Sequence, residues 1–185
     1  MNRIIAAHAG TGKSTFCRMY PNAFVDFTCM KYKYIVPDDY VPEDEESIKA
    51  SYNHEFRMFW QYDYAAAIMR YFLEDYDFKT LVIPSEHRVL ELLRLEGIKY
   101  TLCYPERSAK DVYRQRFVER GNNERFLEIF IDKWDNWIDT LEKTEADRRI
   151  VMKPHEYLSD VIDIEEYKAW EHTAFQIYTA AMTNS

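Results

Sequence analysis

The chain has 185 residues, a formal net charge of −8 and 47% hydrophobic residues. This length predicts a single domain with ample apolar material for a core, and the acidic balance argues against broad binding to nucleic acid or membrane surfaces through bulk electrostatics. The 3 cysteines are far apart and form no Cys-x-x-Cys pair, which favours a reducing, cytoplasmic setting. Because no apolar run approaches about 20 residues and a strand is expected from about residue 3, we expect a soluble protein without a signal sequence.

The first strand leads into a glycine-rich loop. Residues 7–14 read Ala-His-Ala-Gly-Thr-Gly-Lys-Ser, which fits the phosphate-binding pattern of a small residue, four spacers and Gly-Lys-Ser/Thr. Gly10 and Gly12 let backbone N–H groups turn toward an anion. Lys13 can reach the β- and γ-phosphates, and the Ser14 hydroxyl can ligate Mg²⁺. An ordinary strand-to-helix turn is the alternative; the strand before the loop and the helix after it favour phosphate binding.

Strand-like and helix-like segments alternate along the rest of the chain. Short apolar runs are followed by stretches in which apolar residues recur every three or four positions. The expected strands cover residues 4–7, 23–28, 79–84, 98–104 and 149–152, and the expected helices cover 13–20, 48–72, 86–96, 108–120, 123–141 and 164–181. Alternation of this kind requires crossovers. It therefore predicts a three-layer α/β/α domain with a mostly parallel sheet of about five strands.

The helix expected over residues 48–72 is long for a small domain. It would span about 35 to 40 Å if it were continuous, and we therefore expect a break in it. Its aromatic stripe, from Tyr52 to Phe72, favours a buried core face. A platform on which a base stacks is the alternative.

Polar residues follow several strand ends, on the edge of the sheet that carries the glycine-rich loop. Asp26 can hold a Mg²⁺-bound water or accept the proton of an attacking hydroxyl, although an Asp at a strand end is often a turn former. Because no apolar strand ends directly in Asp, Glu86 is the nearest substitute for a second metal-site acid. His87 either lines the cleft or makes a simple hydrogen bond at the start of a helix.

Arginines are concentrated after the fourth strand. Phosphoryl transfer needs positive charge around the moving group, and five arginines are available there, namely Arg107, Arg114, Arg116, Arg120 and Arg125. Arg116 and Arg120 lie four apart, on one helical face that is expected to point inward. The alternative is a solvated helix with ion pairs such as Asp111 with Arg114. The five histidines have no metal-ligand spacing.

These residues resemble the nucleoside and nucleotide kinases of the P-loop superfamily. The nearest resemblance is to the small bacteriophage-type (deoxy)nucleoside monophosphate kinases, which are related to adenylate and shikimate kinases. It rests on the loop at residues 9–15, the acid after the second strand, and the segment from Tyr104-Pro-Glu-Arg to Arg120-Gly-Asn. It implies a P-loop NTPase fold over residues 1–185, with a helical substrate-binding lobe at about 30–76 and a lid at about 105–125.

The resemblance also implies a role for individual residues. ATP would be held by Ala9, Gly10, Thr11, Gly12, Lys13, Ser14 and Thr15, with Lys153 near the adenine, and Mg²⁺ by Ser14 and Asp26. The catalytic residues would be Lys13, Asp26, Arg116 and Arg120, and the acceptor would meet Arg57, Ser85, His87, Arg88, Arg107 and Arg114. One departure concerns the acceptor: the Asp-Gly-Phe-Pro-Arg signature of adenylate kinases is replaced by Pro84-Ser-Glu-His-Arg88.

The leading hypothesis is therefore a phosphotransferase that moves the γ-phosphate of ATP to a nucleoside monophosphate, as a monomer or a homodimer. One rival is a kinase of another small hydroxyl or phosphate compound, with Asp26 as the base. The other is a regulatory module that binds a nucleotide without transferring phosphate. A guanine-specific switch is disfavoured because neither Asn-Lys-x-Asp nor Asp-x-x-Gly occurs in the sequence.

Overall fold

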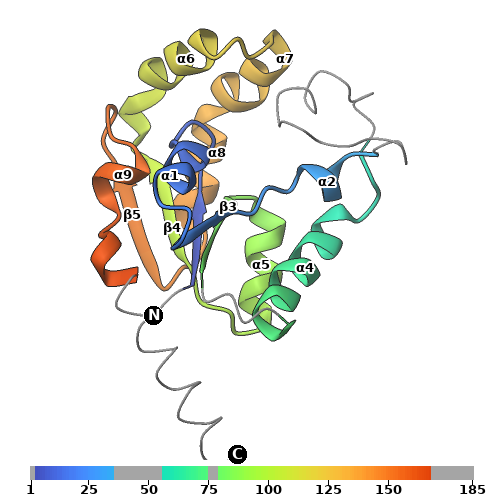
Figure 1. Ribbon diagram of the computed structural model, residues 1–185. Helices are drawn as coiled ribbons and strands as arrows, with labels where there is room; N and C mark the ends of the chain where they lie inside the picture. The colour runs from blue at the N-terminus through green and yellow to red at the C-terminus, as the bar shows by residue number, and fades with distance from the viewer. Residues whose placement is uncertain (1–2, 36–55, 75–78, 168–185) are drawn as a thin grey trace, which may run out of the picture.

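The protein is an α/β domain built on a fully parallel sheet. The computed structural model describes residues 3–35, 56–74 and 79–167 (Figure 1). Its strands are β1 (Ile4–Ala7), β2 (Phe24–Asp26), β3 (Thr80–Pro84), β4 (Thr101–Pro105) and β5 (Arg148–Met152). They are ordered β2-β3-β1-β4-β5, and all four neighbouring pairs are parallel. The predicted fold class is confirmed, since this is the sheet of a P-loop fold with the glycine-rich loop after its central strand.

Helices cover both faces of the sheet. The helical segments are α1 (Lys13–Met19), α2 (Met30–Lys33), α4 (Trp60–Glu74), α5 (His87–Leu95), the 3-10 turn η1 (Arg107–Ala109), α6 (Lys110–Glu119), α7 (Glu124–Leu127), the π-helix η2 (Glu128–Asp132), α8 (Trp134–Lys143) and α9 (Leu158–Val161). None of these helices within the described ranges is long and apolar enough to cross a bilayer.

The side chains of the strands alternate between two cores. Ile4 and Ala6 of β1 pack with residues of α4, α5, α6 and α8 on one face. Ile5 and Ala7 pack with Phe16 of α1 and Leu158 of α9 on the other face. Because successive strand residues point to opposite faces, β1 is buried on both sides, and the three layers follow (Figure 1).

Two of the expected helices are interrupted. The helix expected over 48–72 begins at Trp60, because residues 56–59 are not helical and Phe59 has a φ of 61°. The predicted break is confirmed there, whereas residues 48–55 lie outside the described part. The helix expected over 123–141 is divided into α7, η2 and α8. Of the two asparagines expected to cap it, Asn122 or Asn123, the second does so, since its side chain accepts a hydrogen bond from the Phe126 N–H.

Several other boundaries agree with the sequence pattern. Gly97 and Gly121 follow α5 and α6 with positive φ angles, as expected of helix C-termini. The short helices α2 and α9 were not expected, because four residues are too few to show a helical period. Of the helix expected over 164–181, residues 164–167 are helical, and the remainder lies outside the described part.

Candidate functional site

The glycine-rich loop joins the central strand β1 to α1. Gly10 and Gly12 have φ angles of 81° and 85°, a conformation that side-chain-bearing residues rarely adopt. A Cβ atom on Gly10 would also lie 2.8 Å from Phe117 Cε1, and one on Gly12 would lie 3.1 Å from Tyr157 Cδ1. Both the backbone conformation and the lack of space therefore call for glycine at these two positions.

Lys13 folds back over the loop. Its Nζ donates hydrogen bonds to the carbonyl oxygens of Ala7, at 3.1 Å, and of His8, at 2.9 Å. The Thr11 hydroxyl donates to the same His8 carbonyl at 2.8 Å. The loop thus curls around the ammonium group, which is the arrangement that brings a lysine beside the phosphates of a bound anion.

Two oxygen ligands beside the loop have no partner. Neither the Ser14 hydroxyl nor the Asp26 carboxylate makes a hydrogen bond or an ion pair with any residue in the described ranges. Both Asp26 and Lys13 act on buried Cys17: its thiol pKa is raised to about 12, chiefly by burial and in part by Asp26, while Lys13 opposes the rise. Asp26 therefore lies in the neighbourhood of Lys13.

Glu86 is the other candidate metal-site acid. Its carboxylate accepts a hydrogen bond from the Val89 N–H at 3.2 Å and caps α5. Glu86 therefore has a structural role that Asp26 lacks. Ser85, next to it, is buried, and its N–H donates to the Ala7 carbonyl at 3.2 Å, which fixes the end of β3 against the loop.

Arg116 of α6 is buried against the loop. Its guanidinium donates to the carbonyl oxygens of Gly10 at 3.3 Å, Pro154 at 3.0 Å and Glu156 at 3.3 Å. It also lies over the rings of Tyr113 and Tyr157, 4.7 and 4.0 Å from their centroids. Arg116 thereby joins α6, the loop and the segment after β5. The expectation that the face shared by Arg116 and Arg120 points inward holds for Arg116, whereas Arg120 is exposed.

The predicted lid is largely packed onto the core. Tyr113, Arg116 and Phe117 of α6 are buried, so the exposed part of this segment is the end of α6 and the turn that follows it. The side chain of Arg120 is exposed there, and its guanidinium makes no hydrogen bond or ion pair within the described part of the chain. It is therefore available to a ligand, whereas Arg116 already has three acceptors.

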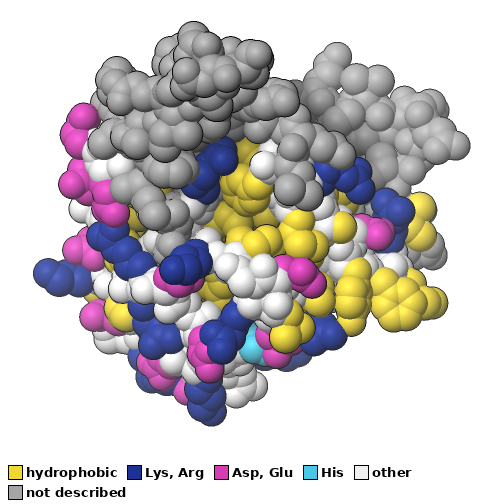
Figure 2. All heavy atoms as spheres, turned by 90° about the horizontal axis from the view of Figure 1, so that it is seen from below, with side chains coloured by type: hydrophobic (Ala, Val, Ile, Leu, Met, Phe, Trp, Pro, Cys, Tyr) yellow, Lys and Arg dark blue, Asp and Glu magenta, His cyan; other side chains and the backbone are white. Residues whose placement is uncertain are grey.

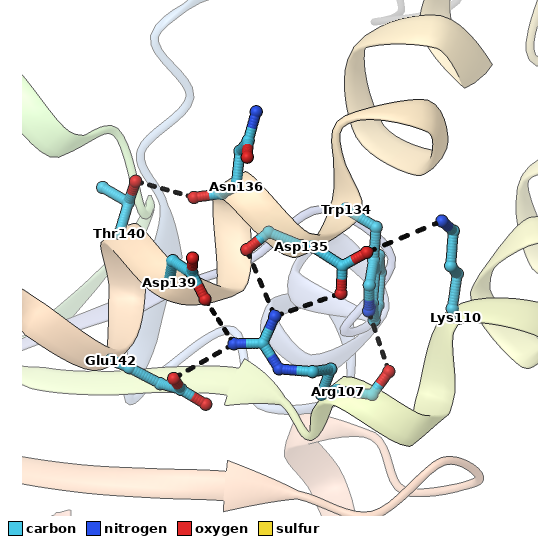
Figure 3. Close-up of polar contacts among 8 residues, drawn as sticks. All are labelled: Arg107, Lys110, Trp134, Asp135, Asn136, Asp139, Thr140 and Glu142. Carbon is cyan, nitrogen blue, oxygen red and sulfur yellow. Dashed lines mark hydrogen bonds and ion pairs between the residues drawn. The ribbon is translucent and has the colours of Figure 1, made fainter.

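Arg107 and Arg114 are bound to carboxylates. Arg107 donates to Asp135 at 3.0 Å, Asp139 at 2.5 Å and Glu142 at 3.2 Å, all on α8 (Figure 3). Arg114 pairs with Asp132 at 3.3 Å, rather than with Asp111 on its own helix. Figure 3 shows the three carboxylates directed at one guanidinium, with Lys110 beside Asp135. We name the group Arg107, Asp135, Asp139 and Glu142 the Arg107 cluster.

The basic residues expected to meet the acceptor also have partners. Arg57 pairs with Asp63 at 3.8 Å. Arg88 donates to Glu91 at 2.9 Å and to the Tyr62 hydroxyl at 2.7 Å. His87 contacts Glu91 at 3.2 Å and Thr144 at 3.4 Å, which agrees with the simpler of its two expected roles. These contacts hold Arg88 and His87 on the surface of α5.

The aromatic stripe of α4 is mainly core. Trp60 and Tyr64 are buried, and Tyr64 stacks on Phe27 with ring centroids 5.7 Å apart. Lys31 and Tyr32 of α2 lie beside this pair, with the lysine Nζ 6.0 Å from the Phe27 centroid. Aromatic rings and the Lys31 ammonium group therefore lie together next to the end of β2. On the far side of the loop, Lys153 is exposed after β5.

Sequence reasoning assigned no role to His8. It is 1% exposed and lies edge-on to the rings of Phe130, Trp134 and Trp137. Burial lowers its pKa to about 3, and the charge of Lys13 contributes to the decrease. The imidazole is therefore neutral at physiological pH. No local pattern distinguishes His8 from the other spacer residues of the loop, because its neighbours come from more than 120 positions away in the sequence.

A hollow at the opposite edge of the sheet is a weaker candidate for an anion site. It is lined by Arg94, Ile98, Tyr100, Glu145, Ala146, Asp147 and Arg149. Its arginines already have partners, since Arg94 pairs with Glu145 and Arg149 donates to the Thr144 carbonyl. Asp147 accepts a hydrogen bond from the Tyr100 N–H. Figure 2, which views the molecule from the end where the strands begin, shows Lys and Arg interspersed with Asp and Glu.

Comparison with known proteins finds similarity among solved structures. No protein-family model matches the chain, and no curated protein matches its sequence. Among solved structures, a gluconokinase from Sinorhizobium meliloti 1021 aligns over 96% of this chain and 95% of its own length, with 13% sequence identity and a TM-score of 0.47.

Proposed function

We propose that this protein is an ATP-dependent phosphotransferase. The observation that carries the proposal is the glycine-rich loop itself, in which Gly10 and Gly12 adopt positive φ angles and Lys13 is folded over the loop carbonyls. The Ser14 hydroxyl and the Asp26 carboxylate lie at the same edge of the sheet, and neither has a hydrogen-bond or ion-pair partner among the residues that the structure describes. Ligands of parallel α/β sheets bind at this edge, beyond the carboxyl ends of the strands.

The residues of the loop fit a magnesium-bound triphosphate. The two glycines leave room where a Cβ would clash, and backbone N–H groups, an ammonium, a hydroxyl and a carboxylate are the donors and ligands that such an anion and its metal require. Residues 9–15 would hold the phosphates, and Ser14 and Asp26 would hold the metal or its water. A magnesium ion held by these residues would supply positive charge that offsets the charge of the phosphates.

Lys13 and Asp26 would carry the transfer. Lys13 exchanges its carbonyl acceptors for phosphate oxygens and neutralises charge on the moving group. Asp26, whose carboxylate has no hydrogen-bond or ion-pair partner within the described residues, would hold a metal-bound water or, with a hydroxyl acceptor, take the proton of the attacking hydroxyl. Arg120, exposed on the turn after α6, supplies further positive charge when that turn approaches the site. Arg116 holds the loop in place through its bonds to backbone carbonyls.

The acceptor proposed here is a nucleoside monophosphate. The partly exposed Phe27 ring, backed by the buried Tyr64, offers aromatic surface for a base, and Lys31 lies over the Phe27 ring. Arg57 and Arg88 both contact α4, through Asp63 and Tyr62, and would bind the acceptor phosphate after release from Asp63 and Glu91. On the ATP side, Lys153 follows β5 near the bonds of Arg116 to Pro154 and Glu156.

A small hydroxyl compound without a phosphate is the second candidate acceptor. It is favoured by the ion pairs of Arg57 and Arg88, which already neutralise the cations that a monophosphate would need. With a hydroxyl acceptor Asp26 would act as the base, whereas a monophosphate would attack through a phosphate oxygen that is ionised at neutral pH. The two candidates differ in whether Arg88 is needed for binding of the acceptor.

The test is a screen for ADP release with Mg-ATP and individual acceptors: ribo- and deoxynucleoside monophosphates, nucleosides, sugars and sugar acids. We expect turnover with a monophosphate, and at least about a hundredfold loss of kcat in Asp26→Asn. Arg88→Gln should raise KM for a monophosphate and leave KM for a neutral acceptor unchanged. If Mg-ATP gives no heat on titration and no acceptor releases ADP, the proposal is wrong.

A further inference from the structure

His8 is a buried titratable residue that the proposed reaction does not use. It is the second residue of the loop motif and is 1% exposed. Its ring centroid lies 5.7 Å from that of Phe130 and 6.0 Å from those of Trp134 and Trp137, with the rings edge to face. We name these three side chains the aromatic box. They come from η2 and α8 and enclose the imidazole.

The His8 Nε2 atom is buried without a hydrogen-bond partner in the described part of the chain. Burying an unpaired polar nitrogen disfavours folding, and aromatic faces offer at most a weak N–H···π contact. A phenylalanine would fill a box of this kind without that cost. The packing of the box therefore gives no reason for a histidine, and unpaired buried groups of this sort commonly mark functional sites.

The backbone of His8 holds the catalytic lysine. Its carbonyl oxygen accepts hydrogen bonds from Lys13 Nζ at 2.9 Å and from the Thr11 hydroxyl at 2.8 Å. Its N–H donates to the Cys103 carbonyl at 3.0 Å. Because the box immobilises the ring, it also fixes the carbonyl to which Lys13 is bound.

The aromatic box belongs to an irregular part of the chain. Phe130 lies in the π-helix η2, and Trp137 Nε1 donates to the Ile129 carbonyl of the same segment at 2.7 Å. Phe126 of α7 packs on Phe130, with centroids 4.5 Å apart. A π-helical turn is an unusual geometry that is frequent at functional sites. Movement of the turn after α6 would therefore reach His8 through Phe126 and Phe130.

We propose that His8 is a positioning residue of the phosphotransfer reaction. Its imidazole places the carbonyl that holds Lys13, and its Nε2 gains a hydrogen-bond partner when the loop and the aromatic box close around a bound triphosphate. This inference rests on the proposed function. The ring acts as a neutral hydrogen-bonding group, and it does not exchange a proton with substrate.

The test compares His8→Phe with His8→Gln. Phenylalanine keeps the ring and removes both nitrogens, whereas the glutamine amide reaches close to the position of Nε2. We expect His8→Phe to melt about 2–8 °C above the wild type, because a buried unpaired nitrogen is gone. Its kcat should fall about tenfold or more through misplacement of Lys13, with KM for ATP changed less than about twofold. His8→Gln should recover most of this kcat.

The outcomes separate this inference from the proposed function. If the wild type and His8→Phe transfer phosphate at the same rate, or if His8→Gln is as slow as His8→Phe, the inference is wrong and the proposed function stands. A melting temperature of His8→Phe below that of the wild type also contradicts it. If the wild type binds no Mg-ATP and phosphorylates no acceptor, the proposed function fails, and the role of His8 fails with it.

Discussion

The phosphate loop and the Arg107 cluster both follow parallel strands at the same edge of the sheet, yet their polar groups are used differently. Beside the loop, Ser14 and Asp26 have no hydrogen-bond or ion-pair partner in the described ranges. In the Arg107 cluster, three carboxylates of α8 surround one guanidinium. A position after a strand end therefore brings a side chain to the site without making it available to a ligand. Availability depends on the partners that the side chain already has.

Lys13→Ala tests the functional side of this contrast and should have the largest effect. Removing the ammonium should lower kcat about 10²–10³-fold, comparable to the loss of one transition-state donor, while the circular dichroism spectrum stays that of the wild type. The matched control is Lys110→Ala, which removes a lysine beside the Arg107 cluster and should leave the rate unchanged. If Lys13→Ala and Lys110→Ala have the same kcat, the loop does not take part in phosphate transfer.

Arg116→Lys should have the next largest effect. A lysine cannot reproduce the planar fork that reaches the carbonyls of Gly10, Pro154 and Glu156. We expect a decrease in the free energy of unfolding of about 1–3 kcal/mol, measured with urea, together with a higher KM for ATP. Arg120→Lys is the control and should leave stability unchanged. If the free energy of unfolding of Arg116→Lys equals that of the wild type, the bonds of this arginine to the carbonyls do not stabilise the fold.

His8 should make the stability of the folded protein decrease at acidic pH. Its pKa of about 3 in the fold lies below the ordinary value of 6.5, so the unfolded chain binds the proton more readily between these values. The stability that neutral His8 contributes to the folded protein is therefore lost as the pH falls from about 6.5 toward about 3. The aromatic box does not titrate, and Lys13 stays charged over this range. As the pH is lowered, the melting temperature of His8→Phe should fall less steeply than that of the wild type. If the two melting temperatures fall in parallel, His8 is not the cause of the acid sensitivity.

Arg107→Gln tests the structural side of the contrast and should have the smallest effect. Its ion pairs are partly exposed, with 42% of the arginine side chain accessible. Pairs of this kind contribute little to stability after screening by solvent and salt. We expect only a small decrease in the free energy of unfolding, shrinking further at high salt, and an unchanged kcat. A large loss of kcat would mean that Arg107 leaves the carboxylates to bind substrate.

Local patterns were sufficient to predict the sheet and the loop. The five strands are short apolar runs, and the loop is a motif whose strand and helix context lies within fifteen residues. Asn123 and Gly121 marked helix ends correctly because capping depends on neighbouring residues. The break before Trp60 was expected from length alone.

The remaining features depend on contacts between distant parts of the chain. Arg116 is separated from Gly10 by 106 positions, so its helical spacing indicated an inward face but not its carbonyl acceptors. The box around His8 and the acids around Arg107 likewise come from η2 and α8. The spacing of apolar residues did not predict the division of the expected helix into α7, η2 and α8, because apolar residues recur at helical spacing across all three segments.

The position of β1 in the middle of the sheet has a consequence for opening of the molecule. Its backbone is bonded to β3 on one side and to β4 on the other, so its amide hydrogens should exchange with deuterium more slowly than those of the edge strands. The glycine-rich loop, which must adjust to each incoming ligand, is thus attached to the strand that unfolds least often. The edge strands can then unfold locally while β1, which holds the loop in place, stays folded.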